Sequence, residues 1–218
     1  MSEFIVYGVP GSPYVRSALL GLHEKGAAYQ FRVLGKDLGA PRSEDHLKVH
    51  PFGRVPILDH GDFRLYETQA ILRYLDSVLT DGPALQPRDA QVAARMNQIA
   101  GIVDWYVFPY LSVGITAERF LSQRFWNRGP DESNIRQALP KAQICVRELE
   151  RLKGSAEFLA GDALSIADLM AAPQLAFFRA TPEGAQLLQG TSLDDWLQRM
   201  CARPSMRATE SDLLKHAA

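Results

Sequence analysis

The chain of 218 residues contains only two cysteines, Cys145 and Cys201. Both lie within amphipathic helical patterns, so we expect each thiol to pack against neighbouring side chains rather than to form a disulfide, ligate a metal or act as a nucleophile. This scarcity excludes a fold held together by disulfides, and we expect no metal site.

Neither sign of charge is in excess, because 24 Lys and Arg are balanced by 25 Asp and Glu, which gives a formal net charge of −1. This balance excludes the basic footprint of a surface that binds nucleic acid or anionic membranes. Apolar runs of ~18 residues, which a transmembrane helix needs, are also missing. The opening Met-Ser-Glu-Phe lacks the basic start of a secretory signal. We therefore expect a cytoplasmic chain with neither nucleic acid nor a membrane as partner.

The most informative pattern that is present is an apolar run that stops at a Gly/Pro turn and restarts as a helix. Phe4 to Tyr7 is predicted to be a buried strand. Ser12 and Pro13 then precede a stripe of apolar residues that ends at Gly26. Ser12 therefore stands at the N-cap of a helix, and Pro13 at its first helical position.

Two interpretations of Ser12 follow from this position. Its hydroxyl caps the helix and does nothing more, or it acts together with the free N–H groups of the helix start, which attract an anion. In the second case the hydroxyl could hold a bound thiolate.

The segments that follow predict a second strand at residues 29–34, parallel to the first, and then an antiparallel hairpin that turns at Gly61. Pro56 begins the hairpin and removes one donor from its ladder, so Val55 lies beside an incompletely paired edge. An extended peptide could pair there. Alternatively, the proline merely ends a loop.

A helix opens at Glu67 and Thr68. An acid beside a hydroxyl at a helix start suits an amino-acid zwitterion, because the acid binds the ammonium and the hydroxyl and backbone N–H groups bind the carboxylate. A purely structural glutamate that complements the helix dipole is the alternative.

Residues 1–79 are thus predicted to form a β-α-β unit followed by a hairpin and a helix, and residues 80–87 are a linker by composition. Residues 88–218 read as helix throughout, with a bend or an end expected at Pro109, an interruption at Pro140 and a last turn or two in the tail. Ser165 and Asp168 have the spacing of a capping box, which is a folding signal.

Aromatic residues gather in the first helices of this second region, and they form either a core between helices or an apolar ligand wall. Tyr106, Tyr110 and Phe120 are our candidates for the wall. We expect the five histidines on the surface or in loops, at His23, His46, His50, His60 and His216.

A strand, a turn and Ser12-Pro13-Tyr14-Val15 resemble the start of a thioredoxin-type domain, whose redox members carry Cys-Pro-Tyr-Cys there. Without either thiol, dithiol exchange is not available. This substitution resembles the glutathione transferases, especially the serine-using phi and tau classes. Further segments resemble motifs of that family in the same order. His50 to Pro56 resembles its Asn-Pro-x-Gly-x-Val-Pro motif, in which the proline is cis, and Glu67 to Ile71 resembles its Glu-Ser-x-Ala-Ile motif. Ser165 to Asp168, followed by Pro173, and Ala202-Arg203-Pro204 resemble its C-terminal signatures.

The resemblance implies an α/β thioredoxin-like domain that binds glutathione, followed by an all-α domain that binds a small hydrophobic electrophile. It implies that Ser12 donates to the glutathione sulfur and that Val55 pairs with the cysteinyl backbone. It assigns the γ-glutamyl end to Glu67 and Thr68. Arg42 stands where the phi class usually has a basic residue near the glycine carboxylate.

Further positions bear on what the resemblance implies. Arg54 stands where the family often has Gln, so its contact is not fixed by the resemblance. Phe52 matches an aromatic residue that in some classes inserts into a partner subunit, which implies a homodimer. Tyr7 is a rival for the role of Ser12, because tyrosine-using classes place the hydroxyl at the end of the first strand; Tyr14 is a further candidate.

The same fold also serves functions other than conjugation. A carrier module without turnover, and a glutathione-dependent peroxidase acting on organic hydroperoxides, are the alternatives. Thiol transfer or reductive dehalogenation normally uses a cysteine at the position of Ser12, so the sequence disfavours both.

Overall fold

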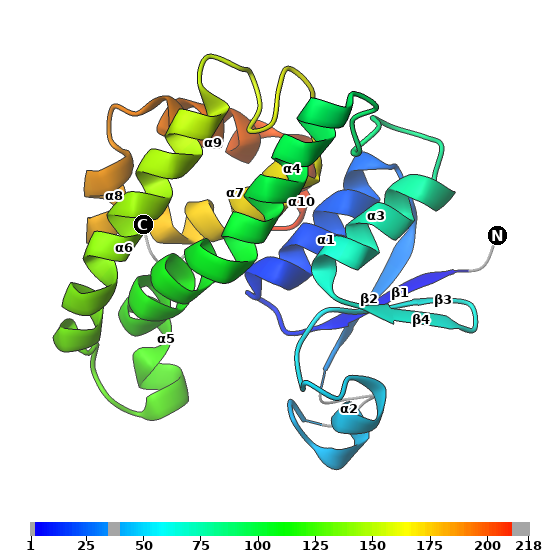
Figure 1. Cartoon of the computed structure of the whole chain (residues 1–218). Helices are drawn as coiled ribbons and strands as arrows, with labels where there is room; N and C mark the ends of the chain where they lie inside the picture. The colour runs from blue at the N-terminus through cyan, green and yellow to red at the C-terminus, as the bar shows by residue number, and fades with distance from the viewer. Residues whose placement is uncertain (1–2, 35–39, 211–218) are drawn as a thin grey trace. The chain divides into compact units, whose positions relative to one another are not determined.

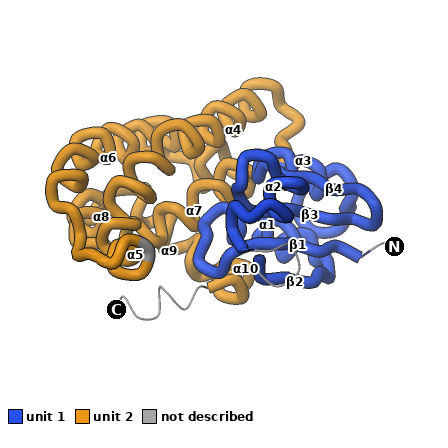
Figure 2. Tube along the Cα trace, turned by 90° about the horizontal axis from the view of Figure 1, so that it is seen from below, with its two compact units in different colours: residues 1–85 blue, residues 86–218 orange. Residues whose placement is uncertain are grey.

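The computed structural model describes residues 3–34 and 40–210 of the chain. The chain divides into two compact units, residues 1–85 and 86–218 (Figure 2). The predicted linker at residues 80–87 spans this division. The last helical turns expected in the tail, and His216, lie outside the described residues.

Unit 1 contains a four-stranded sheet with the order β2-β1-β3-β4. Strand β1 pairs in parallel with β2 and antiparallel with β3, and β3 pairs antiparallel with β4. The elements are β1 (Phe4–Gly8), α1 (Pro13–Glu24), β2 (Tyr29–Val33), α2 (Glu44–Val49), β3 (Ile57–His60), β4 (Phe63–Tyr66) and α3 (Thr68–Val78). The predicted β-α-β unit, hairpin and helix are confirmed. Part of the loop expected at residues 35–47 lies outside the described residues, and the rest leads into α2.

Helices α1 and α3 contact each other and lie on one face of this sheet (Figure 1). Side chains alternate along a strand, so Phe4 and Val6 of β1 point to that face. There they join a core made from both helices and from β3, namely Ala18, Leu22, Leu58, Ile71 and Leu75. The apolar stripes read from the sequence are thus the faces that bury this core.

The start of the predicted linker is held on unit 1 by a buried lysine. Lys25 donates to the Asp76 carboxylate and to the carbonyl oxygen of Pro83, both at 3.1 Å. The Asp76 carboxylate also accepts from the backbone N–H of Leu85 at 2.9 Å. The lysine is 3% exposed and paired, so its burial does not leave an uncompensated charge.

Unit 2 is built from helices packed around α7, whose residues are buried on almost every side. Its elements are α4 (Ala90–Ile102), η1 (Val103–Thr116), α5 (Ala117–Trp126), α6 (Glu132–Lys153), α7 (Ile166–Arg179), α8 (Pro182–Leu188), α9 (Ser192–Ala202) and α10 (Pro204–Ala208). The prediction of a helical second region is confirmed.

The interruption expected at Pro140 is wrong, and of the two outcomes expected at Pro109, a bend or an end, the end is wrong. The helix neither ends at Pro109 nor breaks at Pro140: Pro109 lies inside η1, which has π-helical winding, and Pro140 lies inside α6. Proline normally disrupts a helix because it lacks an N–H and its ring meets the carbonyl four residues earlier. The wider winding of η1 shifts the hydrogen-bond pattern by one residue, which accommodates Pro109.

Helices α4, η1 and α5 therefore follow one another without a gap from Ala90 to Trp126. By length and composition alone the part Ala90–Arg124 could cross a membrane, and 39% of its most apolar stretch is buried inside the protein. Its middle part η1 packs against α6 and α7. The helix is a weak indication of a membrane span, because the core helix of a soluble protein meets the same criteria.

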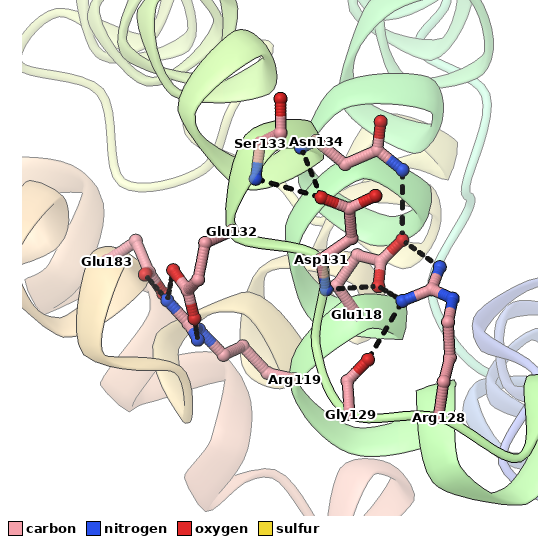
Figure 3. Close-up of polar contacts among 9 residues, drawn as sticks. All are labelled: Glu118, Arg119, Arg128, Gly129, Asp131, Glu132, Ser133, Asn134 and Glu183. Carbon is pink, nitrogen blue, oxygen red and sulfur yellow. Dashed lines mark hydrogen bonds and ion pairs between the residues drawn. The ribbon is translucent and has the colours of Figure 1, made fainter.

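A buried carboxylate joins α5 to the start of α6 (Figure 3). Glu118 is 2% exposed and accepts two hydrogen bonds from Arg128, at 2.8 and 2.9 Å. It also accepts from the Asp131 N–H at 3.0 Å and from the Asn134 amide at 3.1 Å. The Arg128 guanidinium, helped by these two donors, lowers the pKa of Glu118 to about 2.

Replacing this carboxylate should lower the stability of the fold and make that stability depend less on pH in acid. Because the pKa of Glu118 is lowered in the folded state, its stabilisation is complete above the ordinary glutamate pKa and is lost as the pH falls towards about 2. We expect Glu118→Gln to cost about 1–3 kcal/mol of unfolding free energy at neutral pH and to flatten the loss of stability in acid. Urea unfolding at a series of pH values measures both effects.

Glu148→Gln is the matched control, since Glu148 forms a more exposed pair with Arg151 on α6. Its urea midpoint should stay unchanged. Equal midpoints for Glu118→Gln and Glu148→Gln would show that the buried network contributes nothing particular to stability.

Candidate functional site

The strand pairing brings the sequence-predicted glutathione residues to one end of the sheet. Tyr7, near the end of β1, pairs with Ile57 at the start of β3, and Ile57 pairs with Tyr66 at the end of β4. On the other side, Gly8 pairs with Val33 at the end of β2. The segments that leave β1, β2 and β4 and the segment that enters β3 therefore share this end. They carry the candidates Ser12, Arg42, Arg54, Val55, Glu67 and Thr68.

Two helix N-termini also lie at this end, because α1 follows β1 and α3 follows β4. The first N–H groups of a helix have no partner within it, and they carry a partial positive charge. Two such starts beside one another favour the binding of negatively charged groups. This property follows from topology alone.

Ser12 is placed by a tight turn at the end of β1. Its N–H donates to the carbonyl oxygen of Val9 at 3.1 Å, with Pro10 and Gly11 between them. Gly11 has φ = +87°, as the third residue of a type II turn requires. Ser12 is the N-cap of α1, and its hydroxyl oxygen accepts from the Val15 N–H at 3.4 Å. The hydroxyl proton is left free to donate elsewhere.

Close packing fixes the start of α1 against β1. A Cβ added to Gly8 would lie 2.5 Å and 2.7 Å from the two terminal carbons of Val15. Only glycine at this position lets the first turn of α1 approach the strand so closely. The position of Ser12 therefore depends on a contact made one turn further along its helix.

Val55 lies just outside the ladder of the hairpin, which begins at Ile57 and Tyr66. The Val55–Pro56 peptide bond is cis, as the resemblance implied. Val55 is half-buried, while the neighbouring Arg54 side chain is exposed, as is that of Arg42. The backbone groups of Val55 are thus presented at the shared end of the sheet.

Glu67 has an unusual backbone conformation at the start of α3. Its φ of +71° lies in a region that L-residues rarely adopt, at a cost of about 1–3 kcal/mol. Its exposed side chain makes no capping hydrogen bond, whereas Thr68 is buried. Strain of this kind persists where the surrounding structure imposes it, and it is common at binding sites.

Tyr7 points away from the helix that carries Ser12. It follows Val6 along β1, so its ring lies on the sheet face opposite α1 and α3. The ring is 5% exposed, and the guanidinium groups of Arg32 and Arg64 lie 5.8 Å and 5.9 Å from its centre. These contacts occupy the ring in packing and in cation–π interactions.

The expectation that the histidines lie on the surface or in loops is wrong for His46, which is buried inside α2, while His50 follows that helix in a loop but is also buried. His46 and His50 are 0% and 1% exposed. His46 accepts the Arg42 N–H at Nδ1 (2.9 Å) and donates from Nε2 to the Arg54 carbonyl (3.0 Å). This role could not be read from the sequence, because a histidine in a short helix gives no sign of burial. The position of His46 between Arg42 and Arg54 along the chain is the signal that was available.

The aromatic candidates of unit 2 do not share one environment. Tyr106 is 54% exposed. Tyr110 lines a cavity of about 350 Å³ together with Trp126, Arg128 and Lys141, and the Lys141 ammonium lies 4.8 Å from the centre of its ring. Phe120 is half-buried on α5. Tyr110 is therefore the candidate for which the structure provides a cavity.

The capping box at the start of α7 is present. Asp168 is fully buried and accepts from the N–H and hydroxyl of Ser165, both at 2.9 Å. It also accepts from the Leu159 N–H and from the indole N–H of Trp196, again at 2.9 Å. These contacts give Asp168 a structural role that extends from α7 to α9.

Cys145 and Cys201 are not joined in a disulfide, and burial raises the pKa of Cys145 to about 11. A buried thiol with a raised pKa is a poor nucleophile. Within residues 3–34 and 40–210, His, Cys, Asp and Glu side chains do not gather in threes as a metal site would require.

Comparisons with known proteins agree with this arrangement. The family model "Glutathione S-transferase, N-terminal domain" matches residues 2–77, and "Glutathione S-transferase, C-terminal domain" matches residues 145–199. Glutathione S-transferase 1 of Dianthus caryophyllus is 30% identical over 159 residues, which cover 72% of this chain and 68% of the relative. Glutathione S-transferase 4 of Zea mays is 29% identical over 205 residues, 92% of this chain and 88% of the relative.

Solved structures show the same fold over nearly the whole chain. Glutathione S-transferase III in its apo form has a TM-score of 0.83 at 27% identity, with 95% of each chain covered. Glutathione S-transferase I bound with lactoylglutathione has a TM-score of 0.82 at 25% identity, covering 95% of this chain and 98% of the other. The chain belongs to the glutathione S-transferase family and is a glutathione transferase.

Proposed function

We propose that this protein conjugates glutathione to small hydrophobic electrophiles in detoxification, with the Ser12 hydroxyl stabilising the glutathione thiolate. The observation that carries the proposal is the placement of Ser12, a hydroxyl with a free proton at the start of a helix. Ser12 acts as a hydrogen-bond donor and does not itself become the nucleophile. The thiolate sulfur forms a bond to the electrophilic carbon and yields a thioether, while the bond from that carbon to its leaving group breaks, so that chlorodinitrobenzene releases chloride.

The interactions available at Ser12 are large enough for this task. Lowering the pKa of a thiol by about two units from ~8.5 requires roughly 2.7 kcal/mol of preference for the thiolate. A hydrogen bond to a charged group supplies ~1.5–3 kcal/mol. The start of a helix adds ~0.3–1 kcal/mol. Together they reach the required size without a general base.

The other residues at the same end of the sheet fit the rest of the tripeptide. The backbone of Val55 is free of the β3 ladder and would pair with the cysteinyl segment. The exposed carboxylate of Glu67 and the start of α3 would hold the ammonium and carboxylate of the γ-glutamyl end. Arg42 and Arg54 supply positive charge for the glycine carboxylate.

We favour Ser12 over Tyr7 because the two side chains belong to different sheet faces. The Tyr7 ring packs under Arg32 and Arg64, whereas Ser12 lies at a helix start that attracts anions. Tyr106, Tyr110 and Phe120 stay our candidates for contact with the electrophile. A peroxidase activity would use the same thiolate and is assayed beside conjugation. A cytoplasmic location stays a prediction of the sequence.

Ser12→Ala tests the mechanism most simply. We expect turnover of chlorodinitrobenzene to fall about 10- to 100-fold, because a hydrogen bond of about 1.5–3 kcal/mol to the thiolate is lost. Loss of the cap should also cost about 1 kcal/mol of stability, which urea unfolding monitors. Tyr7→Phe is the control and should keep wild-type turnover. Full activity in Ser12→Ala together with loss in Tyr7→Phe would transfer the role to Tyr7.

A second prediction concerns the contact that places Ser12. In Gly8→Ala the new methyl group meets Val15, so α1 must shift and kcat/KM should fall while stability drops by about 1–3 kcal/mol. Adding Val15→Ala makes room for the methyl group and should restore much of the activity. Wild-type kinetics in the single variant would show that Ser12 does not depend on this packing.

We also propose that the protein is a homodimer held in part by Phe52, whose ring is 70% exposed. Phe52→Ser should shift the sedimentation coefficient from dimer towards monomer, because an aromatic anchor at an interface is lost. Phe63→Ser is matched to it, since Phe63 is also exposed on unit 1, at 49%. The idea is refuted by a monomeric wild type, or by a dimer that tolerates Phe52→Ser as well as it tolerates Phe63→Ser.

A further inference from the structure

Two buried histidines connect the segments that are proposed to bind glutathione. His46 lies in α2, and His50 follows the end of that helix, one turn later. Both side chains are almost fully buried although α2 has only six residues and His46 is the only buried one among them. Histidine is the residue type whose charge changes near neutral pH, so a buried pair at a binding site has consequences for pH dependence.

His46 joins two stretches of backbone by its two ring nitrogens. Nδ1 accepts the N–H of Arg42, and Nε2 donates to the carbonyl oxygen of Arg54. Only the neutral ring protonated on Nε2 can make both bonds, because a protonated ring is a donor at both nitrogens. The Arg42 loop and the segment entering cis-Pro56 are therefore linked through a neutral His46.

His50 joins the same segment to the end of β4. Its ring stacks on Tyr66, with centres 4.4 Å apart and planes inclined by 28°, and its edge meets Phe52. Its Nδ1 is buried without a hydrogen-bond partner. Tyr66 directly precedes Glu67, the residue with the strained backbone at the start of α3. The His50 ring thus supports the turn that presents Glu67 and Thr68.

The surroundings of His50 oppose its protonation. From α2 it faces His46, from the following loop Arg54, and from β4 the uncharged ring of Tyr66. Among the described residues, no carboxylate compensates a charge there. Burial, assisted by His46 and Arg54, lowers the pKa of His50 below its ordinary value.

We propose that neutral His46 and His50 are positioning residues for glutathione, and that protonation of His50 reversibly weakens glutathione binding in mildly acidic solution. The pair holds Arg42, Arg54–Val55 and Glu67–Thr68 in the arrangement that binds the tripeptide. This inference rests on the proposed function, because it concerns the same site.

The sign of the effect follows from linkage. The ordinary pKa of histidine is about 6.5, and that of His50 in the folded protein is lower. The ordered arrangement is therefore fully stabilised above about pH 6.5 and loses stability as the pH falls through the lower, folded value.

The test measures binding of S-methylglutathione by calorimetry from about pH 7.5 to about pH 5.5. This ligand has no ionisable thiol, so the chemistry of Ser12 does not enter the result. We expect the wild-type Kd to rise severalfold over this range, and by less than the roughly 10-fold limit of a group with a pKa of about 6.5. His50→Phe keeps a stacking ring that cannot titrate, so its Kd at pH 5.5 should stay within about 2-fold of its own Kd at pH 7.5.

His46→Phe fills the same space without hydrogen bonds and should bind about 10-fold more weakly already at pH 7.5. In steady-state kinetics its KM for glutathione should rise while kcat changes little. His60→Phe is the matched control: His60 bonds to the Tyr74 hydroxyl and stacks on Phe4, at the other end of the sheet. It should keep the pH profile of the wild type. Circular dichroism checks that each variant is folded.

The outcomes separate this inference from the proposed function. A wild type whose Kd does not change with pH, or the same acid dependence in wild type and His50→Phe, would overturn the role of the histidines and leave the glutathione site in place. A wild type that fails to bind S-methylglutathione even at pH 7.5 would overturn the proposed function itself. An unfolded His46→Phe leaves the decision to His50→Phe.

Discussion

The site depends above all on the antiparallel register between β1 and β3, in which Tyr7 lies opposite Ile57. Because β3 runs antiparallel to β1, the segment that enters β3 lies at the same end of the sheet as the segment that leaves β1. The hairpin then returns β4 to the same end, where α3 begins beside α1. A slip of one residue would reverse the facing of every side chain in the strand and bury the wrong set against the helices. The strand register therefore determines both the core and the site.

Further contacts near this end of the sheet hold the residues that the strand register brings there. Gly8 lets Val15 pack against β1 and so fixes Ser12. His46 ties the Arg42 backbone to that of Arg54, and the His50 ring supports Tyr66 ahead of the strained Glu67. None of these supporting groups need touch the ligand. In the proposed site they would keep exposed, charged and strained groups in one arrangement before glutathione binds, which would reduce the ordering that binding requires.

The local sequence was sufficient to predict much of this. Alternating apolar strands, the turn before Ser12 and the capping box of Ser165 and Asp168 act over a few residues, so they can be read from the chain. The burial of His46 and His50 could not be predicted, because it is set by strands distant in the sequence. The interruption expected at Pro140 is wrong, since α6 continues through it, and the helix does not end at Pro109, where π-helical winding carries it on. The residues around Tyr110 could be proposed only as a group, because the helix phase was not fixed by sequence.

The central claim is that a serine hydroxyl at a helix start stabilises a bound thiolate. Its most direct test is the ionisation of glutathione in the binary complex, followed by the ultraviolet absorbance of the thiolate as the pH is raised. The account predicts that the thiol bound to the wild-type protein ionises about two pH units below free glutathione, and that most of this shift disappears in Ser12→Ala. A bound thiol that titrates as it does in free solution, or the same shift in Ser12→Ala, would contradict the account.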